Sequence, residues 1–235
     1  MLLAIAASLA AGQACQDRLF DNPFDPDASS VVFEIAATIP SPAGEPRGLT
    51  WDGNTLWNVD ASTNTLLSLN SLNGALIRSL PSPVPDASGV AYDGQDLWVC
   101  SRSNTTVAKI NLLNGDILKS FDLQRGVFTA LEFREGALWL AEAQSNTIQR
   151  VDPETGAMAE AFHDPGTRVD GLAFDGLSFW LSDSSTLTIY QVESGGSLER
   201  TFLSPGPSPR GLAHDGLDLW NVDGNQKIYR LRLSN

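Results

Sequence analysis

Short runs of apolar residues alternate with turn signals along most of the chain. In many of these runs apolar residues alternate with polar or small ones, as in Thr147-Ile-Gln-Arg-Val151, and a period of two is typical of a β-strand. Asp-Gly pairs, Asn-Gly pairs and proline-rich segments separate the runs, and these are turn signals. The pattern predicts an all-β fold of many short strands.

The strand pattern repeats five times. Segments of the form Gly-Leu-x-aromatic-Asp-Gly-x-x-Leu-Trp align without gaps, and they begin at Gly48, Gly89, Ala130, Gly171 and Gly211. The copies are therefore 41 residues apart, and 40 at the last step. Each copy predicts four strands: strand A with the Gly-Leu-x-aromatic run, strand B with the Leu-Trp pair, then strands C and D. A repeat of this length predicts a five-bladed β-propeller of four-stranded blades over residues 31–235.

Strand A and the chain ends predict how the blades assemble. One face of strand A carries bulky residues such as Leu49 and Trp51, and the other carries small ones such as Gly48 and Thr50. We expect the bulky face of one blade to pack against the small face of the next. The last copy ends after its strand C, whereas residues 31–39 resemble a strand D. The N-terminal strand is therefore expected to complete the fifth blade and close the ring.

The repeat resembles the NHL and YVTN type of short-repeat β-propeller unit. The resemblance rests on Gly171-Leu-Ala, Asp175-Gly176, Leu56-Trp-Asn-Val-Asp60 and Asn146-Thr-Ile148. It implies the fold and not an activity, because this repeat serves enzymes and binding modules alike. In size and blade number the chain is also similar to the bacterial and plant-type glutaminyl cyclases. Their Thr-Gln-Gly-Leu and Tyr-Glu-Ser-Thr type motifs are missing, so no catalytic residue is carried over.

The N-terminus resembles an export signal. An apolar run from Met1 to Ala11 precedes Gly12-Gln-Ala14 and then Cys15, which predicts a signal peptide over residues 1–14. Cleavage before a cysteine resembles the bacterial lipobox and implies lipidation of Cys15. Residues 15–30 are acidic and contain prolines, as in the linkers of bacterial lipoproteins. We expect an exported protein of the bacterial cell envelope, periplasmic or at the cell surface, that meets a membrane only through a lipid anchor.

Charge and composition narrow the possible functions. The formal net charge of −13 argues against nucleic acid, because phosphate binding needs clustered basic residues. Two histidines cannot form a three-histidine metal site, and neither a nucleophile elbow nor a phosphate loop occurs. Cys100 lies within a predicted strand and is expected to be a buried thiol. The sequence therefore predicts no catalytic set and no cofactor.

Four carboxylates stand at the predicted turns between strands B and C: Asp60, Glu142, Asp183 and Asp223. We expect each to accept backbone N–H groups of its own turn, and the alternative is a ring of oxygens that binds Ca²⁺. Glu132 interrupts the small face of strand A. Its expected partner is Arg134, since a buried charge needs one, and channel water is the alternative. His214 stands in the aromatic column of strand A and is expected to pack between blades.

A polar sector is predicted where the first and last blades meet. Strand A is preceded by Arg47, Asp170 or Arg210 in three copies, and Asn58 and Asn221 occupy an otherwise apolar column of strand B. In a propeller these positions lie on one face, around the central channel. The expected ligand site comprises Arg47, Asn58, Asp60, Asp170, Arg210, Asn221 and Asp223.

We expect the two arginines of this sector to hold a carboxylate or a similar planar anion. The asparagines would add hydrogen bonds deeper in the channel, and Asp170 would contact an amine. The alternative is that Arg47 and Arg210 pair with Asp60 or Asp223 and brace loops. A second alternative is that the first and last copies are simply the most recent duplicates.

The leading functional hypothesis is a binding or interaction module for a small acidic or zwitterionic ligand, or for a protein or peptide. The first alternative is an enzyme acting in the channel mouth, such as a propeller lyase, a lactonase or a glutaminyl cyclase. The second is a purely structural protein of the envelope.

Overall fold

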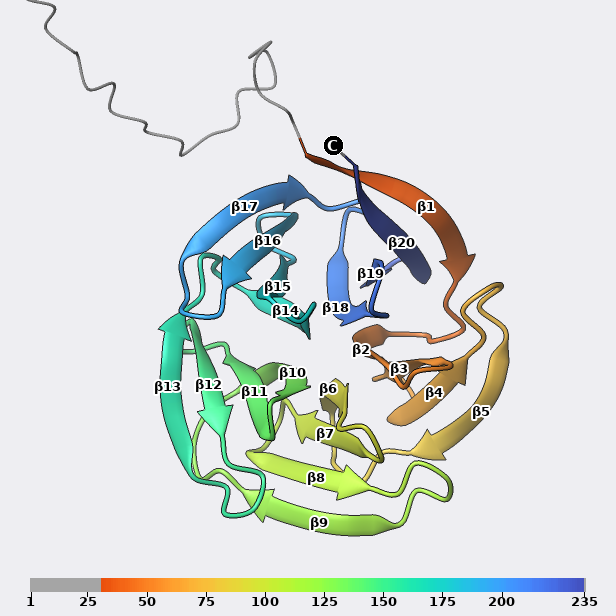
Figure 1. The fold of residues 1–235 in the computed structure, drawn as a ribbon. Helices are drawn as coiled ribbons and strands as arrows, with labels where there is room; N and C mark the ends of the chain where they lie inside the picture. Colours follow the sequence, from red (N-terminus) through yellow and green to blue (C-terminus); the bar gives the residue numbers. More distant parts are fainter. Residues whose placement is uncertain (1–30, 235) are drawn as a thin grey trace, which may run out of the picture.

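The computed structural model describes residues 31–234 of the chain. These residues form five antiparallel sheets of four strands each, arranged around a central axis (Figure 1). The chain is a five-bladed β-propeller. The predicted signal peptide (1–14), the linker (15–30) and Cys15 lie outside the described residues. Within residues 31–234 no helix is long and apolar enough to cross a membrane.

In four of the blades the strands follow one another from the axis outward in chain order. The first blade has β2 (Pro46–Trp51), β3 (Leu56–Asp60), β4 (Thr65–Leu69) and β5 (Leu76–Pro81). The second has β6 (Ala87–Tyr92), β7 (Leu97–Ser101), β8 (Thr106–Ile110) and β9 (Ile117–Asp122). The third has β10 (Phe128–Arg134), β11 (Ala137–Glu142), β12 (Thr147–Val151) and β13 (Met158–His163). The fourth has β14 (Val169–Phe174), β15 (Ser178–Asp183), β16 (Thr188–Glu193) and β17 (Leu198–Leu203).

The fifth blade combines the two ends of the described chain. It contains β18 (Pro209–His214), β19 (Leu219–Asp223), β20 (Lys227–Ser234) and, as its outer strand, β1 (Val32–Pro40). β1 pairs with β20 from Val32 opposite Ser234 to Pro40 opposite Lys227. Phe33 of β1 also packs on Phe202 of the fourth blade, with ring centroids 4.3 Å apart. The predicted closure by the N-terminal strand is confirmed.

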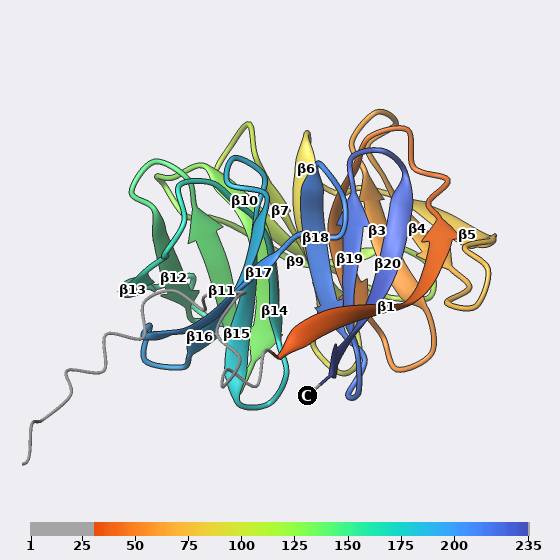
Figure 2. The same cartoon turned by 90° about the horizontal axis from the view of Figure 1, so that it is seen from above.

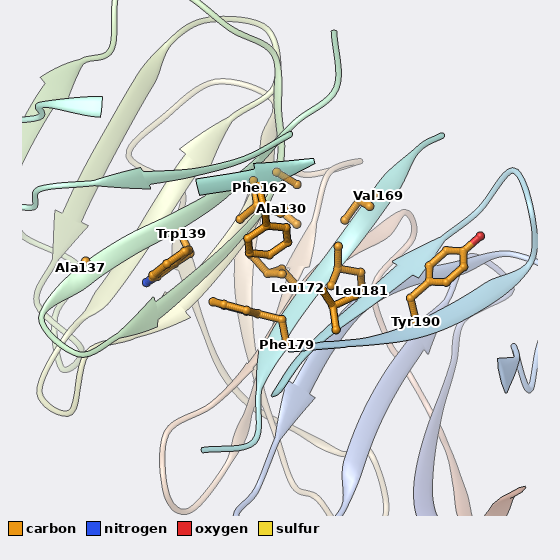
Figure 3. Packing of buried hydrophobic residues seen from close by; sticks show 12 residues of the cluster. Ala130, Ala137, Trp139, Phe162, Val169, Leu172, Phe179, Leu181 and Tyr190 are labelled. Carbon is orange, nitrogen blue, oxygen red and sulfur yellow. The ribbon is translucent and has the colours of Figure 1, made fainter. Parts of the chain in front are cut away.

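The apolar core lies between the blades. Figure 3 shows one such cluster, in which Leu172 and Phe179 of the fourth blade meet Ala130 and Trp139 of the third. The Phe179 ring lies 4.8 Å from that of Trp139. The bulky face of strand A thus packs on the small face of the preceding blade, and the expected packing against the next blade is wrong. Strict alternation defines two faces but not which neighbour each face meets, which the handed twist of the strands decides.

The innermost strands approach one another backbone to backbone. A Cβ atom added to Gly48 would lie 2.7 Å from the carbonyl oxygen of Ser88 and 2.8 Å from the amide nitrogen of Val90. One added to Gly89 would lie 2.6 Å from the amide nitrogen of Leu131. These positions therefore need glycine because the strand A of the following blade leaves no room for a side chain.

In four blades an Asp–Trp hydrogen bond holds the turn that follows the C-terminal end of strand A. The indole N–H groups of Trp57, Trp98, Trp180 and Trp220 donate to Asp52, Asp93, Asp175 and Asp215 at 2.7–2.9 Å. In the third blade Arg134 replaces the aspartate, and the indole nitrogen of Trp139 has no partner among the described residues. Arg134 lies over the Phe174 ring at 3.8 Å and pairs with Glu135 at 3.1 Å. The expected pair of Glu132 with Arg134 is therefore wrong.

Candidate functional site

The central channel is lined by the strand A residues and is closed. The residues that border it include the strand A glycines Gly48, Gly89, Gly171 and Gly211. Between them no space remains that a water-sized sphere can enter. Asp170 stands at one end of this lining. Asp170 is the second residue of β14, so it stands at the end of the channel where the strands A begin, and we call this end the mouth.

Three arginines surround the carboxylate of Asp170 at this mouth. Arg210 of β18 lies 3.4 Å from it, Arg168 lies 3.4 Å from it, and Arg102 lies 4.0 Å from it. They come from three blades: Arg102 follows β7, Arg168 precedes β14, and Arg210 lies near the start of β18. The Asp170 side chain is 6% exposed, and the arginine side chains are 27–45% exposed. We call these four residues the arginine mouth.

Among residues 31–234, the guanidinium groups of the arginine mouth have only Asp170 as a side-chain partner, and some of their N–H donors remain unpaired. Arg102, Arg168 and Arg210 contact Asp170 as ion pairs, and Ser184 donates the hydrogen bond that this carboxylate accepts. Burial lowers the pKa of the Arg102 guanidinium, Asp170 opposes this, and the positive charges of neighbouring arginines lower it further. Like charges held together in this way favour an additional anion.

Arg47 belongs to a separate ion-pair group. It lies 2.9 Å from Glu45 and 2.5 Å from Asp86. Burial alone would lower the pKa of Arg47, but the bonds to Glu45 and Asp86 outweigh it and raise the pKa above its ordinary value. Its guanidinium also lies 3.4 Å from the carbonyl oxygen of Ala87, to which it donates. Arg47 and Arg210 thus have different carboxylate partners, and neither pairs with Asp60 or Asp223.

The two asparagines are structural. Asn58 and Asn221 are fully buried. Asn58 donates to the carbonyl oxygen of Gly48 at 2.9 Å, and Asn221 donates to that of Gly211 at 3.2 Å. In both blades the pairing of strands A and B is irregular at this glycine. The asparagines therefore satisfy carbonyl groups that the bulge leaves free, and the expectation that they reach a ligand is corrected.

The four carboxylates at the B–C turns also have a structural role, because they accept hydrogen bonds from backbone N–H groups. Asp60 accepts from the backbone of Ser62 and Glu45 at 3.0 and 3.1 Å, so it ties its own turn to the loop before strand A. Asp223 does the same with Asn225 and Ser208, at 2.7 and 2.8 Å. Equivalent bonds are made by Asp183 to Thr186 and Thr167 and by Glu142 to Ser145 and Val127.

These bonds bear out the expected structural role of the four carboxylates. Within residues 31–234 no group of three or more His, Cys, Asp or Glu side chains is placed to hold a metal ion. The Ca²⁺ alternative therefore gains no support from the geometry.

The remaining singled-out residues stand apart from the mouth. Glu132 accepts the backbone N–H of Phe133 at 2.8 Å, and burial raises the pKa of its carboxyl to about 8. His214 lies at the far end of β18 from Arg210 and accepts the N–H of Gly216. Cys100 is a fully buried thiol, as expected, and burial raises its pKa to about 11.

The sequence pattern predicts only part of the arginine mouth. Asp170 and Arg210 were expected from the column before the strand A glycine, and the structure brings them together. Arg102 and Arg168 were missed because they lie in loops next to that column. The available signal was their position: each directly adjoins a strand end on the face where strand A begins.

Comparisons with known proteins bear on the fold. No family model matches the chain, and no curated protein matches it either. The structure of Myxococcus xanthus glutaminyl cyclase superposes with a TM-score of 0.75 at 14% identity, covering 87% of this chain and 97% of that one. Virginiamycin B lyase from Staphylococcus aureus gives a TM-score of 0.52 at 22% identity, covering 83% of this chain and 69% of that one.

A third similar structure is the β-propeller domain of Cps50 (Swd1) from Myceliophteria thermophila. It gives a TM-score of 0.55 at 12% identity, covering 86% of this chain and 100% of that domain. These likenesses show the fold. The similar structures include two enzymes and a propeller domain that is not named as an enzyme. At such low sequence identities a shared propeller fold does not indicate a shared activity.

Proposed function

We propose that this protein is an exported binding module, anchored through a lipid on Cys15, that holds a small carboxylate-bearing ligand at the arginine mouth. The observation that carries the proposal is the gathering of Arg102, Arg168 and Arg210 around one carboxylate with guanidinium donors unused. A guanidinium fork matches a planar carboxylate with two parallel hydrogen bonds. Three forks from three blades suit a ligand with more than one carboxylate group.

Asp170 serves this site as a positioning residue. It is almost fully buried and is surrounded by Arg102, Arg168 and Arg210, so it is not free to bind an amine. Its negative charge keeps the three guanidinium groups together when no ligand is present. The ligand of the proposed site is therefore acidic and lies above Asp170, at the entrance of the closed channel.

The alternative is an enzyme of the lyase, lactonase or glutaminyl cyclase kind. A general acid or base must lie within hydrogen-bond reach of the reacting group. Among residues 31–234 the two histidines lie elsewhere: His214 is at the opposite end of strand A, and His163 ends the outer strand β13. The carboxylate of the mouth, Asp170, is already engaged by arginines and Ser184. These placements favour binding over catalysis.

The test of binding uses succinate, citrate and acetate as probes, with isothermal titration calorimetry on the full chain. We expect the di- and tricarboxylates to bind more tightly than acetate. The double variant Arg102→Gln with Arg168→Gln is expected to weaken binding at least tenfold, because it removes two of the three forks. Arg150→Gln is the matched control, since Arg150 is exposed on β12, away from the mouth.

Equal binding by the double variant and the control would overturn the proposed site, and so would the absence of binding in the unchanged protein. Conversion of a glutaminyl peptide or opening of a lactone by the purified protein would favour the enzyme alternative. For the anchor, Cys15→Ser is expected to move the protein from the membrane to the soluble fraction. Unchanged fractionation would contradict lipidation.

A further inference from the structure

A second cavity lies in the third blade, below the loop that joins β9 to β10. Its volume is about 250 Å³. The lining includes Arg125 from the loop, Glu142 at the end of β11, Gln149 of β12, and Met158 and Glu160 of β13. The arginine mouth contributes no residue to it. The cavity is therefore independent of the proposed ligand site.

The repeat explains why this space is open in the third blade. In every blade one residue of the loop before strand A is matched with one residue of strand C. The pairs are Ala43 with Leu67, Val84 with Ala108, Arg125 with Gln149, Gly166 with Tyr190, and Gly206 with Tyr229. Four of the five pairs are apolar or combine a glycine with an aromatic ring. The third blade alone has two long polar side chains in the matched pair.

Tyrosine fills the corresponding space in the fourth and fifth blades. Tyr190 and Tyr229 are only 8% and 7% exposed. A Cβ atom added to Gly166 would lie 3.2 Å from the Tyr190 ring, and one added to Gly206 would lie 3.0 Å from the Tyr229 hydroxyl. Gln149 is smaller than tyrosine, and the Arg125 side chain is exposed. The third blade thus has neither the ring nor the tight loop contact.

A displaced bulge adds a charge to the same cavity. In the first, second and fourth blades the pairing of strands C and D shifts before Leu69, Ile110 and Val192. In the third blade the shift comes two positions earlier in the repeat, before Gln149. Glu160 therefore stands opposite Gln149, and side chains of such cross-strand pairs share one face of the sheet. The bulge brings a carboxylate to a wall where the other blades have small residues.

The polar groups of the cavity are of opposite charge and are largely free. Arg125 has no ion pair within the described residues, and Glu160 has only the exposed His163, at 3.7 Å. Gln149 donates its amide N–H to Thr147 at 2.6 Å, which leaves its carbonyl oxygen as an acceptor. Glu142 is committed to the backbone of its turn. A ligand therefore meets a cation on the loop and acceptors on the strands.

We propose that this cavity binds a free zwitterionic α-amino acid. Arg125 receives the carboxylate, since a guanidinium fork matches its two oxygens. Glu160 and the carbonyl oxygen of Gln149 accept hydrogen bonds from the ammonium group. The thioether of Met158 packs against the side chain of the ligand, because methionine adapts to irregular apolar shapes. The volume is below the range typical of drug-sized ligands and suits a molecule of this size.

The test compares whole and half ligands. The full chain is titrated with the free L-amino acids by ligand-observed NMR, and with acetate and methylammonium as the separate charged halves. At least one amino acid is expected to bind at least tenfold more tightly than either half. The double variant Arg125→Gly with Gln149→Tyr gives the third blade the residues of the fourth and fifth blades. It fills the cavity with a pair that the fold already accepts, so we expect at least tenfold weaker binding and an unchanged or raised melting temperature.

Two controls separate this site from the arginine mouth. Arg102→Gln with Arg168→Gln is expected to leave the binding of amino acids with a single carboxylate unchanged while it weakens citrate binding. Glu160→Gln is expected to weaken amino-acid binding and to leave acetate binding unchanged. The proposal is overturned if no amino acid binds, or if acetate binds the Arg102→Gln, Arg168→Gln variant as tightly as the best amino acid does. It is also overturned if the cavity-filled variant is folded and binds amino acids as well as the unchanged protein.

Discussion

At the residue scale, a single aspartate performs two tasks in four of the five blades. Asp52 accepts the backbone N–H groups of Asn54 and Thr55 at 2.8 and 2.6 Å and the indole N–H of Trp57 at 2.7 Å. It thereby shapes the hairpin between strands A and B and orients a fully buried tryptophan. Burial alone would raise the pKa of Asp52, but these hydrogen bonds outweigh it and hold the pKa below its ordinary value.

Replacing Asp52 by alanine is expected to lower the free energy of unfolding by about 1–3 kcal/mol at pH 7, because the buried indole N–H loses its partner. The measurement is urea denaturation followed by tryptophan fluorescence. A lowered pKa stabilises the fold above the ordinary pKa of aspartate, and this contribution is lost as the pH falls through the lowered value. The difference between the two proteins should therefore shrink in acid.

The matched control for this prediction is Asp116→Ala, in an exposed turn where the carboxylate bonds the side chain of Asn114. We expect it to change the free energy of unfolding by less than about 0.5 kcal/mol. A gap between Asp52→Ala and the unchanged protein that widens from pH 7 to pH 3 would contradict the role given to the ionised carboxylate.

At the scale of elements, the ring depends on how closely neighbouring strands A approach. The bulge at Gly48 bends β2 so that its backbone meets that of β6, and Asn58 fills the hydrogen bond that the bulge leaves open. In two other blades a hydroxyl group of strand A bonds across to the strand A of the following blade. Ser88 donates to the carbonyl oxygen of Phe128 at 2.7 Å, and Thr129 donates to that of Val169. The contact between strands A is thus both steric and polar.

Gly48→Ala is expected to cost about 1–3 kcal/mol of unfolding free energy, as in an overpacked core, since the obstructing atoms belong to backbone. Gly195→Ala is the control, because its added Cβ meets no atom within 4 Å and its φ is not positive. We expect the control to be neutral or stabilising by up to about 1 kcal/mol. Equal effects of the two substitutions on the thermal midpoint would show that strand A contacts do not limit stability.

At the scale of the whole molecule, the first strand makes the ring continuous. β1 supplies the outer strand of the fifth blade, and its Phe33 packs on Phe202 of the fourth. Without β1 the backbone edge of β20 would be unpaired along its length. An exposed edge of this kind pairs with other chains.

A chain that begins at Ser41 is therefore expected to self-associate and to melt at a lower temperature. A chain that begins at Val31 keeps β1 and is the control, expected to remain as stable as the full protein. Light scattering after size-exclusion chromatography measures the association, and circular dichroism measures the melting. If both truncated chains stay monomeric with the same midpoint, ring closure by β1 does not stabilise the fold.

The repeat register made most of the fold predictable, and the site much less so. Five aligned tryptophans fixed the blade number, and the missing strand D of the last copy fixed the closure. The direction of packing between blades and the closure of the channel depend on twist and ring radius, which alternation does not encode. Asn58 was expected to contact a ligand because no sequence signature reveals the bulge at Gly48, whose carbonyl oxygen accepts the hydrogen bond from the Asn58 amide. Arg102 was not predicted because it lies in a loop, where the direction of a side chain depends on the tertiary structure and not on strand alternation.

The pairing of Val32 with Ser234 places both ends of the described chain at the same end of the propeller. Strand A begins at the arginine mouth, and because successive strands of a blade are antiparallel, β1 begins at the opposite end of the propeller. The two ends of the described chain thus lie side by side, on the side away from the mouth (Figure 2). A fluorescent protein joined directly to Val31 or to Ser234, or a sensor chip linked at either residue, would leave the arginines turned toward the solution.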